Sequence, residues 1–413
     1  MSSLVELCRS LKAASAVLAC TDTAAKNAAL MCVAESIRAR EASILAANRT
    51  DVEAARRRGM KESLIDRLSL SEKRIEEMLS GLKEIVSLPD PVWRSSEVFS
   101  LSNGLTIQKM TVPLGVIAII YESRPNVTVD AFSLALKSGN CIFLRGSSSA
   151  VNSNKALVAA IKEGLAASSV SEAVIELADS ESHDEVRTLL SLRQYIDLVI
   201  PRGGKDLIDF VVENSRIPTI ETGVGNCHVF VDSSADFKKA LDIVENAKTQ
   251  RPGVCNAIES LLVHVDIAQE FLPGLYERIG GRVEFRGCER TVAIIPAKPA
   301  TEEDWATEYL DYILAVRVVD SFEDALSHIE RYGTRHSEAI VTEDYEHAMA
   351  FVRRVDAAAV YVNASTRFTD GGQMGFGAEM GISTQKIHAR GPVGLSQLVS
   401  VKYVGFGNGQ VRE

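Results

Sequence analysis

An alternation of short apolar runs with segments of helical periodicity constrains the fold more than any other feature of the sequence. In the first half of the chain, the apolar runs cover residues 115–122, 141–146, 174–177, 197–201 and 217–221. A second series begins after about residue 250 and covers 257–265, 282–285, 312–320, 337–344 and 357–363. Runs that are apolar on both faces predict buried strands of a mostly parallel sheet with helices on both sides. We therefore expect an α/β protein with two doubly wound parallel-sheet domains and a cleft between them.

The first ninety residues lack this alternation and predict helices. Ser69 and Glu72 have the spacing of a capping box, in which the two side chains satisfy backbone N–H groups at the start of a helix. The residues after them carry an apolar stripe with helical spacing, formed by Ile75, Met78, Leu79, Leu82 and Ile85. We therefore expect a helix that starts at this box and buries the stripe.

Residues 97–112 interrupt the α/β pattern with two short strand-like segments around Asn103 and Gly104. Asn-Gly is the strongest two-residue signal for a β-hairpin. An isolated two-stranded ribbon is marginally stable in water, so this one needs further strands. The end of the chain, residues 398–407, is the best candidate to supply a strand, and we expect the hairpin to be an oligomerisation arm at a subunit interface.

The composition excludes several classes of protein. The formal net charge of −10 argues against a nucleic-acid partner, which would need clustered basic residues. No apolar run reaches the ~18 residues of a membrane span, and the first fifteen residues lack the long apolar core of a signal peptide. The seven Cys form no CxxC pair, which indicates reduced thiols and no metal site. A cytoplasmic enzyme without a membrane partner fits these features.

Cys255 is the residue most suited to covalent chemistry. It follows the turn signal Pro252-Gly253 and precedes an apolar run, so it is expected at a junction between a loop and a strand. A cysteine is already a good nucleophile at neutral pH, although most buried cysteines are only small apolar residues. No His adjoins Cys255 in the sequence, so the residues do not indicate a Cys–His pair.

Two short segments could bind phosphate groups, although each could also be a simple tight turn. Gly203 and Gly204 lie between an apolar run and a helical segment, where backbone N–H groups can approach a pyrophosphate. Arg145 ends the run 141–146 and is followed by three serines that begin at Ser147, a set suited to a ribose 2′-phosphate. The chain contains no GxxxxGK[ST] phosphate-binding loop, and this argues against a kinase.

Two polar residues at the ends of apolar runs could take part in catalysis. Asn126 lies just before a helical segment, where an Asn is most often an N-cap, but its amide could instead donate to an oxyanion. Glu221 ends the run 217–221 beside two glycines and could act as a base or as a ribose ligand.

Four long stretches together carry a resemblance to a known family. Residues 113–140, 217–232, 248–264 and 362–395 resemble the aldehyde dehydrogenase superfamily and, within it, the glutamate-5-semialdehyde dehydrogenases, which reduce γ-glutamyl phosphate. The likeness covers nearly the whole chain, and the last stretch is distinctive of this branch. It departs from the branch at residues 144–150, where members commonly have a second Gly and a Glu or Lys.

The resemblance implies a role for each matching position. Cys255 would be the nucleophile, Asn126 the oxyanion-hole amide, and Glu221 the counterpart of the general base of hydrolytic members. The implied contacts to the cofactor, NADPH, are from Arg145, Ser147, Gly203, Gly204 and Glu308, with Glu308 on the nicotinamide ribose. The residues implied for the substrate are Arg124, Ser365, Thr366 and Arg367.

The resemblance further implies an aldehyde-dehydrogenase-like fold with residues 1–235 as the cofactor domain and 236–362 as the catalytic domain. Residues 363–413 would return to the cofactor domain and end in an oligomerisation strand. The implied reaction is reduction of L-glutamyl 5-phosphate to L-glutamate 5-semialdehyde by NADPH, with release of phosphate, through a Cys255 thioester in proline biosynthesis. A homo-oligomer, dimer or tetramer, is expected, and direct transfer of the acyl phosphate from a glutamate 5-kinase is left open.

Two other readings remain beside this one. The first is NAD(P)-dependent oxidation of another small aldehyde by the same thiol chemistry, which Arg145 with its serines speaks against. The second is a non-catalytic nucleotide-binding relic of the superfamily. Such relics usually lose the nucleophile, whereas Cys255, Asn126 and Glu221 are all present.

Overall fold

The structure is a computed structural model that describes residues 2–122, 124–178 and 183–412. It divides into two compact units. Unit 1 consists of Met1–Glu221, Gly375–Gly381 and Val393–Glu413, and unit 2 of Thr222–Met374 and Ile382–Pro392. The first boundary lies earlier than the expected residue 235, because the strand that begins at Cys227 pairs within the sheet of unit 2. The chain also returns to unit 1 later than the expected residue 363.

Unit 1 is built on a four-stranded parallel sheet of order β5-β4-β3-β6. Its strands are β3 (Val116–Tyr121), β4 (Cys141–Arg145), β5 (Ile175–Leu177) and β6 (Leu198–Arg202). A helix follows each strand along the chain: α6 (Asn126–Lys137) follows β3, α7 (Val151–Ala166) follows β4, α8 (His183–Leu189) follows β5, and α9 (Lys205–Asn214) follows β6. All six residues of β3 are buried, so both faces of this strand are covered, as its apolar run predicts.

Helices make up the first part of unit 1, as predicted: α1 (Ser2–Leu18), α2 (Thr23–Ala39), α3 (Glu41–Arg57), α4 (Glu62–Leu68) and α5 (Glu72–Ser87). The apolar stripe of α5 is buried as expected. Its cap, however, is Ser71, whose side chain accepts from the N–H of Arg74. The predicted cap Ser69 instead donates to the carbonyl of Ile65 at the end of α4.

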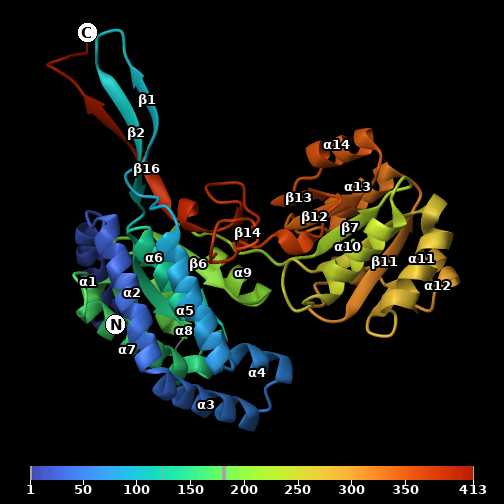
Figure 1. Cartoon of the computed structure of the whole chain (residues 1–413), viewed down its shortest axis with the longest axis horizontal. Helices are drawn as coiled ribbons and strands as arrows, with labels where there is room; N and C mark the ends of the chain where they lie inside the picture. Colours follow the sequence, from blue (N-terminus) through green and yellow to red (C-terminus); the bar gives the residue numbers. More distant parts are fainter. Residues whose placement is uncertain (1, 123, 179–182, 413) are drawn as a thin grey trace. The chain divides into compact units, whose positions relative to one another are not determined.

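A three-stranded antiparallel sheet, which we call the arm, forms a separate ribbon of unit 1 (Figure 1). It consists of β1 (Ser95–Ser100), β2 (Thr106–Pro113) and β16 (Val399–Phe406), with β2 in the middle. Gly104 has φ +84°, as a tight turn after Asn103 requires. The prediction of a hairpin that pairs with the end of the chain is confirmed.

Unit 2 is built on a seven-stranded sheet of order β10-β9-β11-β8-β7-β12-β13, in which every pair is parallel. Its strands are β7 (Cys227–Val231), β8 (Ile258–His264), β9 (Glu284–Gly287), β10 (Lys298–Pro299), β11 (Ile313–Val319), β12 (Ser337–Val341) and β13 (Ala359–Val362). Figure 1 shows helices along both sides of this sheet. The helices are α10 (Phe237–Thr249), α11 (Val265–Ile279), α12 (Glu289–Ile294), α13 (Phe322–Tyr332) and α14 (Tyr345–Arg354).

Each face of the unit 2 sheet has its own apolar cluster. The larger cluster joins the sheet to α10 and α11, and the smaller one joins it to α13 and α14. Successive residues of β7 point to opposite faces of the sheet, so Val229 belongs to the larger cluster and Phe230 to the smaller. The prediction of two α/β units with parallel sheets and a hairpin is therefore confirmed. Among the described residues, no helix has the length and apolar character needed to cross a membrane.

Candidate functional site

Cys255 lies in unit 2, in the turn between α10 and β8, and is partly exposed. The turn is packed closely against the start of β7. The thiol of Cys227 donates to the carbonyl oxygen of Cys255 over 3.1 Å. A Cβ atom on Gly225 would lie 1.5 Å from the same oxygen, so only glycine fits there. The position of the turn that carries the candidate nucleophile is therefore fixed by its neighbours.

The segment that contains the predicted substrate residues 365–367 lies directly against this turn. The hydroxyl of Thr366 donates to the carbonyl oxygen of Asn256 over 2.7 Å, and the amide of Asn256 donates to the carbonyl oxygen of Thr369 over 2.8 Å. Thr366 is fully buried and Ser365 nearly so, whereas Arg367 is half-buried. The structure thus brings all three beside the Cys255 turn, with Arg367 the least enclosed.

Buried polar groups next to the Cys255 turn form a continuous series of polar contacts. Burial raises the pKa of the Cys227 thiol well above its usual value, so this group is a protonated donor. Its sulfur lies 3.6 Å from Nδ1 of His336, which lies 2.9 Å from the hydroxyl of Ser337. The Ser337 hydroxyl in turn donates to Thr369 over 2.7 Å. This series of polar contacts could not be predicted from the sequence, because most of its members are distant in sequence.

Glu308 also belongs to unit 2. Its Oε1 accepts from the backbone N–H of Gly225 over 2.7 Å. The carboxylate predicted for the nicotinamide ribose therefore holds the loop that packs on the Cys255 turn. Asn226 anchors the same loop, because its amide donates to the carbonyl oxygens of Trp305 and Tyr332, each over 2.8 Å.

The other predicted residues lie in unit 1, at the carboxyl ends of its parallel strands. Arg145 ends β4 and is paired in register with Ile120 of β3, while Arg202 ends β6 beside Tyr121. Ligands of open α/β sheets bind at this edge. Glu221 is half-buried and is the last residue before the chain enters unit 2.

Asn126 is the first residue of α6, and its amide donates to Oδ2 of Asp130 over 2.9 Å. Burial raises the pKa of Asp130 to about 6, although the Asn126 amide and the charge of Arg202 lower it. These three residues line a cavity of about 50 Å³ with Arg124 and Glu379, and with apolar side chains that include Met380. Arg124 and Asn126 thus line the same cavity, and the Asp130 carboxylate accepts a hydrogen bond from one N–H group of the Asn126 amide.

The turn between β6 and α9 contains Gly203 and Gly204, as predicted, but it also has an anionic neighbour. Oε2 of Glu122 accepts from the N–H of Gly204 over 2.9 Å. A Cβ atom on Gly203 would lie 2.5 Å from the same oxygen. Near β4, the hydroxyl of Ser147 lies 2.6 Å from that of Ser149. Glu122 was missed from the sequence because its partner is 82 residues away.

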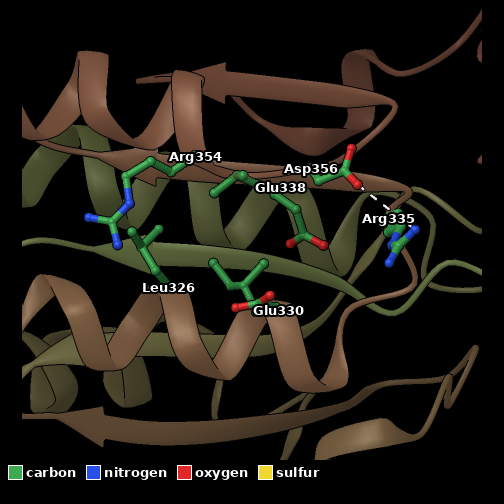
Figure 2. Close-up of a pocket in the computed structure, with 8 residues that line it drawn as sticks. Leu326, Glu330, Arg335, Glu338, Arg354 and Asp356 are labelled. Atoms are coloured by element: carbon green, nitrogen blue, oxygen red, sulfur yellow. Dashed lines mark ion pairs between the residues drawn. The ribbon is translucent and has the colours of Figure 1, made fainter. Parts of the chain in front are cut away.

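Unit 2 also contains a cavity of about 170 Å³ that holds none of the predicted residues. Figure 2 shows Glu330 and Glu338 among the side chains that line it and the pair Arg335–Asp356 at one end, with 3.8 Å between Nη1 and Oδ2. Glu338 is buried, and its Oε2 accepts from the backbone N–H of His228 over 2.8 Å. Among the described residues, no group of three or more His, Cys, Asp and Glu could hold a metal ion.

Known proteins resemble this chain over its whole length. The model of the aldehyde dehydrogenase family matches residues 12–282. The γ-glutamyl phosphate reductase of Alkaliphilus oremlandii is 61% identical over 413 residues, which are 100% of both chains. The crystal structure of γ-glutamyl phosphate reductase from Thermotoga maritima, 54% identical, covers 99% of this chain and 100% of its own, with a TM-score of 0.97. An acetylating aldehyde dehydrogenase from Geobacillus thermoglucosidasius, 17% identical with a TM-score of 0.74, shares the fold across 100% and 98% of the chains.

Proposed function

Because the chain belongs to the aldehyde dehydrogenase family and, within it, to the γ-glutamyl phosphate reductases, we propose that it reduces L-glutamyl 5-phosphate to L-glutamate 5-semialdehyde. The reaction releases phosphate and is a step of proline biosynthesis. The observation that carries this proposal is the 61% identity to a reductase of that name along the entire chain. Oxidation of another small aldehyde is the less favoured alternative.

The proposed reaction begins at the Cys255 thiolate. Its sulfur attacks the acyl carbon of the substrate, the C–S bond forms, the bond from carbon to the phosphate oxygen breaks, and phosphate leaves as an anion. The product on the protein is a thioester, and a bound reduced nicotinamide would supply the hydride that turns it into the anion of a thiohemiacetal. Collapse of this anion breaks the C–S bond, releases the aldehyde and restores the thiolate, with no net transfer of a proton. Glu221, the proposed counterpart of the general base of hydrolytic members, stays a candidate catalytic residue.

Asn126 is proposed to donate to the oxyanion that forms in both tetrahedral species. One such donor is typically worth ~3–4 kcal/mol of transition-state stabilisation. The bond to Asp130 supports this role, because a carboxylate accepts but cannot donate and so fixes which end of the amide faces it. The bond to Asp130 therefore also fixes the direction of the second N–H group of the Asn126 amide, the one proposed to donate to the oxyanion.

Unit 1 is proposed to bind the nicotinamide cofactor, and NADPH in preference to NADH. The donors at the ends of β4 and β6 suit an anionic ligand, since Arg145, the serine hydroxyls and the backbone N–H of Gly204 all lie at this edge of the sheet. Arg145 would pair with the 2′-phosphate that NADH lacks. Glu122 is the exception to this fit, because its carboxylate already accepts from Gly204. Glu308 of unit 2 is proposed for the nicotinamide ribose.

The substrate is proposed to be held by Arg124, Ser365, Thr366 and Arg367. A guanidinium group can bind a carboxylate or a phosphate through two parallel hydrogen bonds. Arg124 lines the small cavity with Asn126, and Arg367 is the least enclosed residue of its segment. Thr366 donates to Asn256, so its contribution is to hold the segment in place.

The arm is proposed to pair subunits into a homo-oligomer. Its strands expose large apolar side chains, among them Tyr403 at 64%, Val98 at 58% and Phe406 at 57%. Exposed apolar side chains on such a ribbon suit burial against a second subunit. Sedimentation of the chain at micromolar concentration tests this, and a monomer would contradict it. A glutamate 5-kinase partner and a cytoplasmic location also remain proposals.

One assay tests the proposed function: reduction of NADP⁺ by glutamate 5-semialdehyde in the presence and absence of phosphate. We expect reduction that depends on phosphate, because phosphate must cleave the thioester in the reverse direction. No reduction with glutamate 5-semialdehyde, with or without phosphate, would favour the alternative, in which another aldehyde is the substrate.

A further inference from the structure

We propose that Arg367 pairs electrostatically with the Cys255 thiolate and keeps this nucleophile ionised before the substrate arrives. The inference rests on the proposed function, which makes Cys255 the nucleophile, and it supplies a means of activation. A free thiol is only a few per cent thiolate at pH 7, and other cysteine enzymes often use a neighbouring His to ionise it. Here the nearby histidine, His336, lies against Cys227 and Ser337.

The geometry places Arg367 beside the Cys255 turn through contacts on both sides of it. Before the cysteine in sequence, Oε1 of Gln250 accepts from Nε of Arg367 over 2.9 Å. After the cysteine, the amide of Asn256 lies 3.5 Å from the carbonyl oxygen of Arg367 and bonds to that of Thr369. Side chain and backbone of Arg367 are thus both tied to residues that flank Cys255.

The charges in this region favour an anion next to Arg367. Burial lowers the pKa of Arg367, because the half-buried guanidinium loses contact with water, and the like charge of Arg251 lowers it further. The carboxylate of Asp370 and the Cys255 thiolate both raise it. Attraction between two charges is mutual, so a thiolate that stabilises the guanidinium is itself stabilised by it.

Two cations, Arg367 and Arg251, lie near the turn, and the Cys255 thiolate raises the pKa of Arg367. Cys227 stays protonated and donates to the Cys255 carbonyl, so it adds no competing charge. Among the described residues, the charged and titratable groups that act on this region include Arg251 just after α10, Asp370, Glu308, which accepts from the N–H of Gly225, His336 before β12, and Glu259 and Glu338, which act on Cys227.

The test is the pH dependence of Cys255 alkylation by iodoacetamide, followed by peptide mass spectrometry on the full chain without substrate or cofactor. Removing an opposite charge within a few ångströms typically shifts a pKa by about one to two units. We expect Arg367→Gln to raise the apparent pKa of Cys255 by that amount, which leaves about tenfold less thiolate at pH 7, and Arg367→Lys to raise it less. The matched control is Arg353→Gln, an exposed arginine of α14, which should leave the profile unchanged.

A second variant shifts the profile the other way. Asp370→Asn removes the carboxylate that opposes the thiolate but keeps an oxygen to accept from the N–H groups of Gly372 and Gln373. It should lower the apparent pKa of Cys255, which keeps the inference testable if Arg367→Gln does not fold. An unchanged profile in Arg367→Gln, or a shift of the same sign in both variants, would overturn the pairing. Because the assay contains no substrate, its outcome is separate from that of the proposed reaction.

Discussion

The turn that carries Cys255 in unit 2 and the turns at the sheet edge of unit 1 are built on different principles. The Cys255 turn is crowded and fixed by groups that no ligand needs, such as Gly225 and the Cys227 thiol. At the sheet edge of unit 1, carboxylates instead accept from groups that could donate to an anion: Glu122 accepts from Gly204 in the turn before α9, and Asp130 accepts from Asn126 within the first turns of α6. The contrast suggests a rigid position for the atom that forms covalent bonds and a set of donors in unit 1 that a ligand can recruit.

The largest effect is expected at the fixed turn. Cys255→Ala should abolish reductase turnover, because no neighbouring group can form the thioester, while the fold and cofactor binding remain intact. Activity is measured in the phosphate-dependent reverse assay and cofactor binding by fluorescence titration. Residual activity above a few per cent of the wild type would contradict the covalent mechanism.

The next largest effect is expected at Asn126. Asn126→Ala removes the proposed oxyanion donor and should lower kcat by about 10²–10³, the usual cost of losing one such donor. Asn126→Asp, which replaces the donor by an acceptor beside Asp130, should be at least as impaired. The affinity for the cofactor should not change in either variant. A kcat within a few-fold of the wild type would remove Asn126 from the proposed mechanism.

A smaller effect is expected at Arg145, and it concerns cofactor choice. A charge-assisted bond to the 2′-phosphate contributes ~1.5–3 kcal/mol, roughly ten- to a hundredfold in affinity. Arg145→Ala should weaken NADPH binding by that factor and leave NADH binding almost unchanged, with Arg145→Lys in between. Equal losses for the two cofactors in a titration would show that Arg145 only packs against the adenosine.

Local patterns in the sequence predicted the elements well, because burial and turn chemistry act over a few residues. The run of β3 is buried throughout, and the hairpin lies at Asn103-Gly104. Even here, details depended on tertiary context. Two serines two residues apart could each cap α5, and Ser71 does so because Ser69 bonds to the preceding helix.

The candidate site was less predictable, since its geometry depends on contacts between distant residues. The sequence singled out Cys255 by its turn and Asn126 by its place before a helix. It gave no sign that Asp130 would hold the Asn126 amide or that Gln250 would orient Arg367. The end of unit 1 at Glu221 was also missed, because the pairing of β7 with β12 joins residues about 110 positions apart.

The smallest effect, and the one of opposite sign, is expected at Glu122. Its carboxylate accepts from the N–H of Gly204 at the start of α9, the donor proposed for the cofactor pyrophosphate, so the two anions should compete. Charges near a helix N-terminus are typically worth 0.3–1 kcal/mol, so removal of this one should strengthen NADPH binding by roughly two- to fivefold. Glu122→Gln keeps an oxygen that can accept from Gly204 and removes only the charge.

Asp206→Asn is the matched control, because Asp206 also carries a negative charge in the first turn of α9. Fluorescence titration with NADPH should show a clear gain for Glu122→Gln and a smaller one for the control. Equal gains would reveal a general effect of charge on the helix. Weaker binding in Glu122→Gln would mean that the carboxylate holds the turn in the shape that the cofactor needs, in which case the unit 1 edge resembles the fixed turn of Cys255 after all.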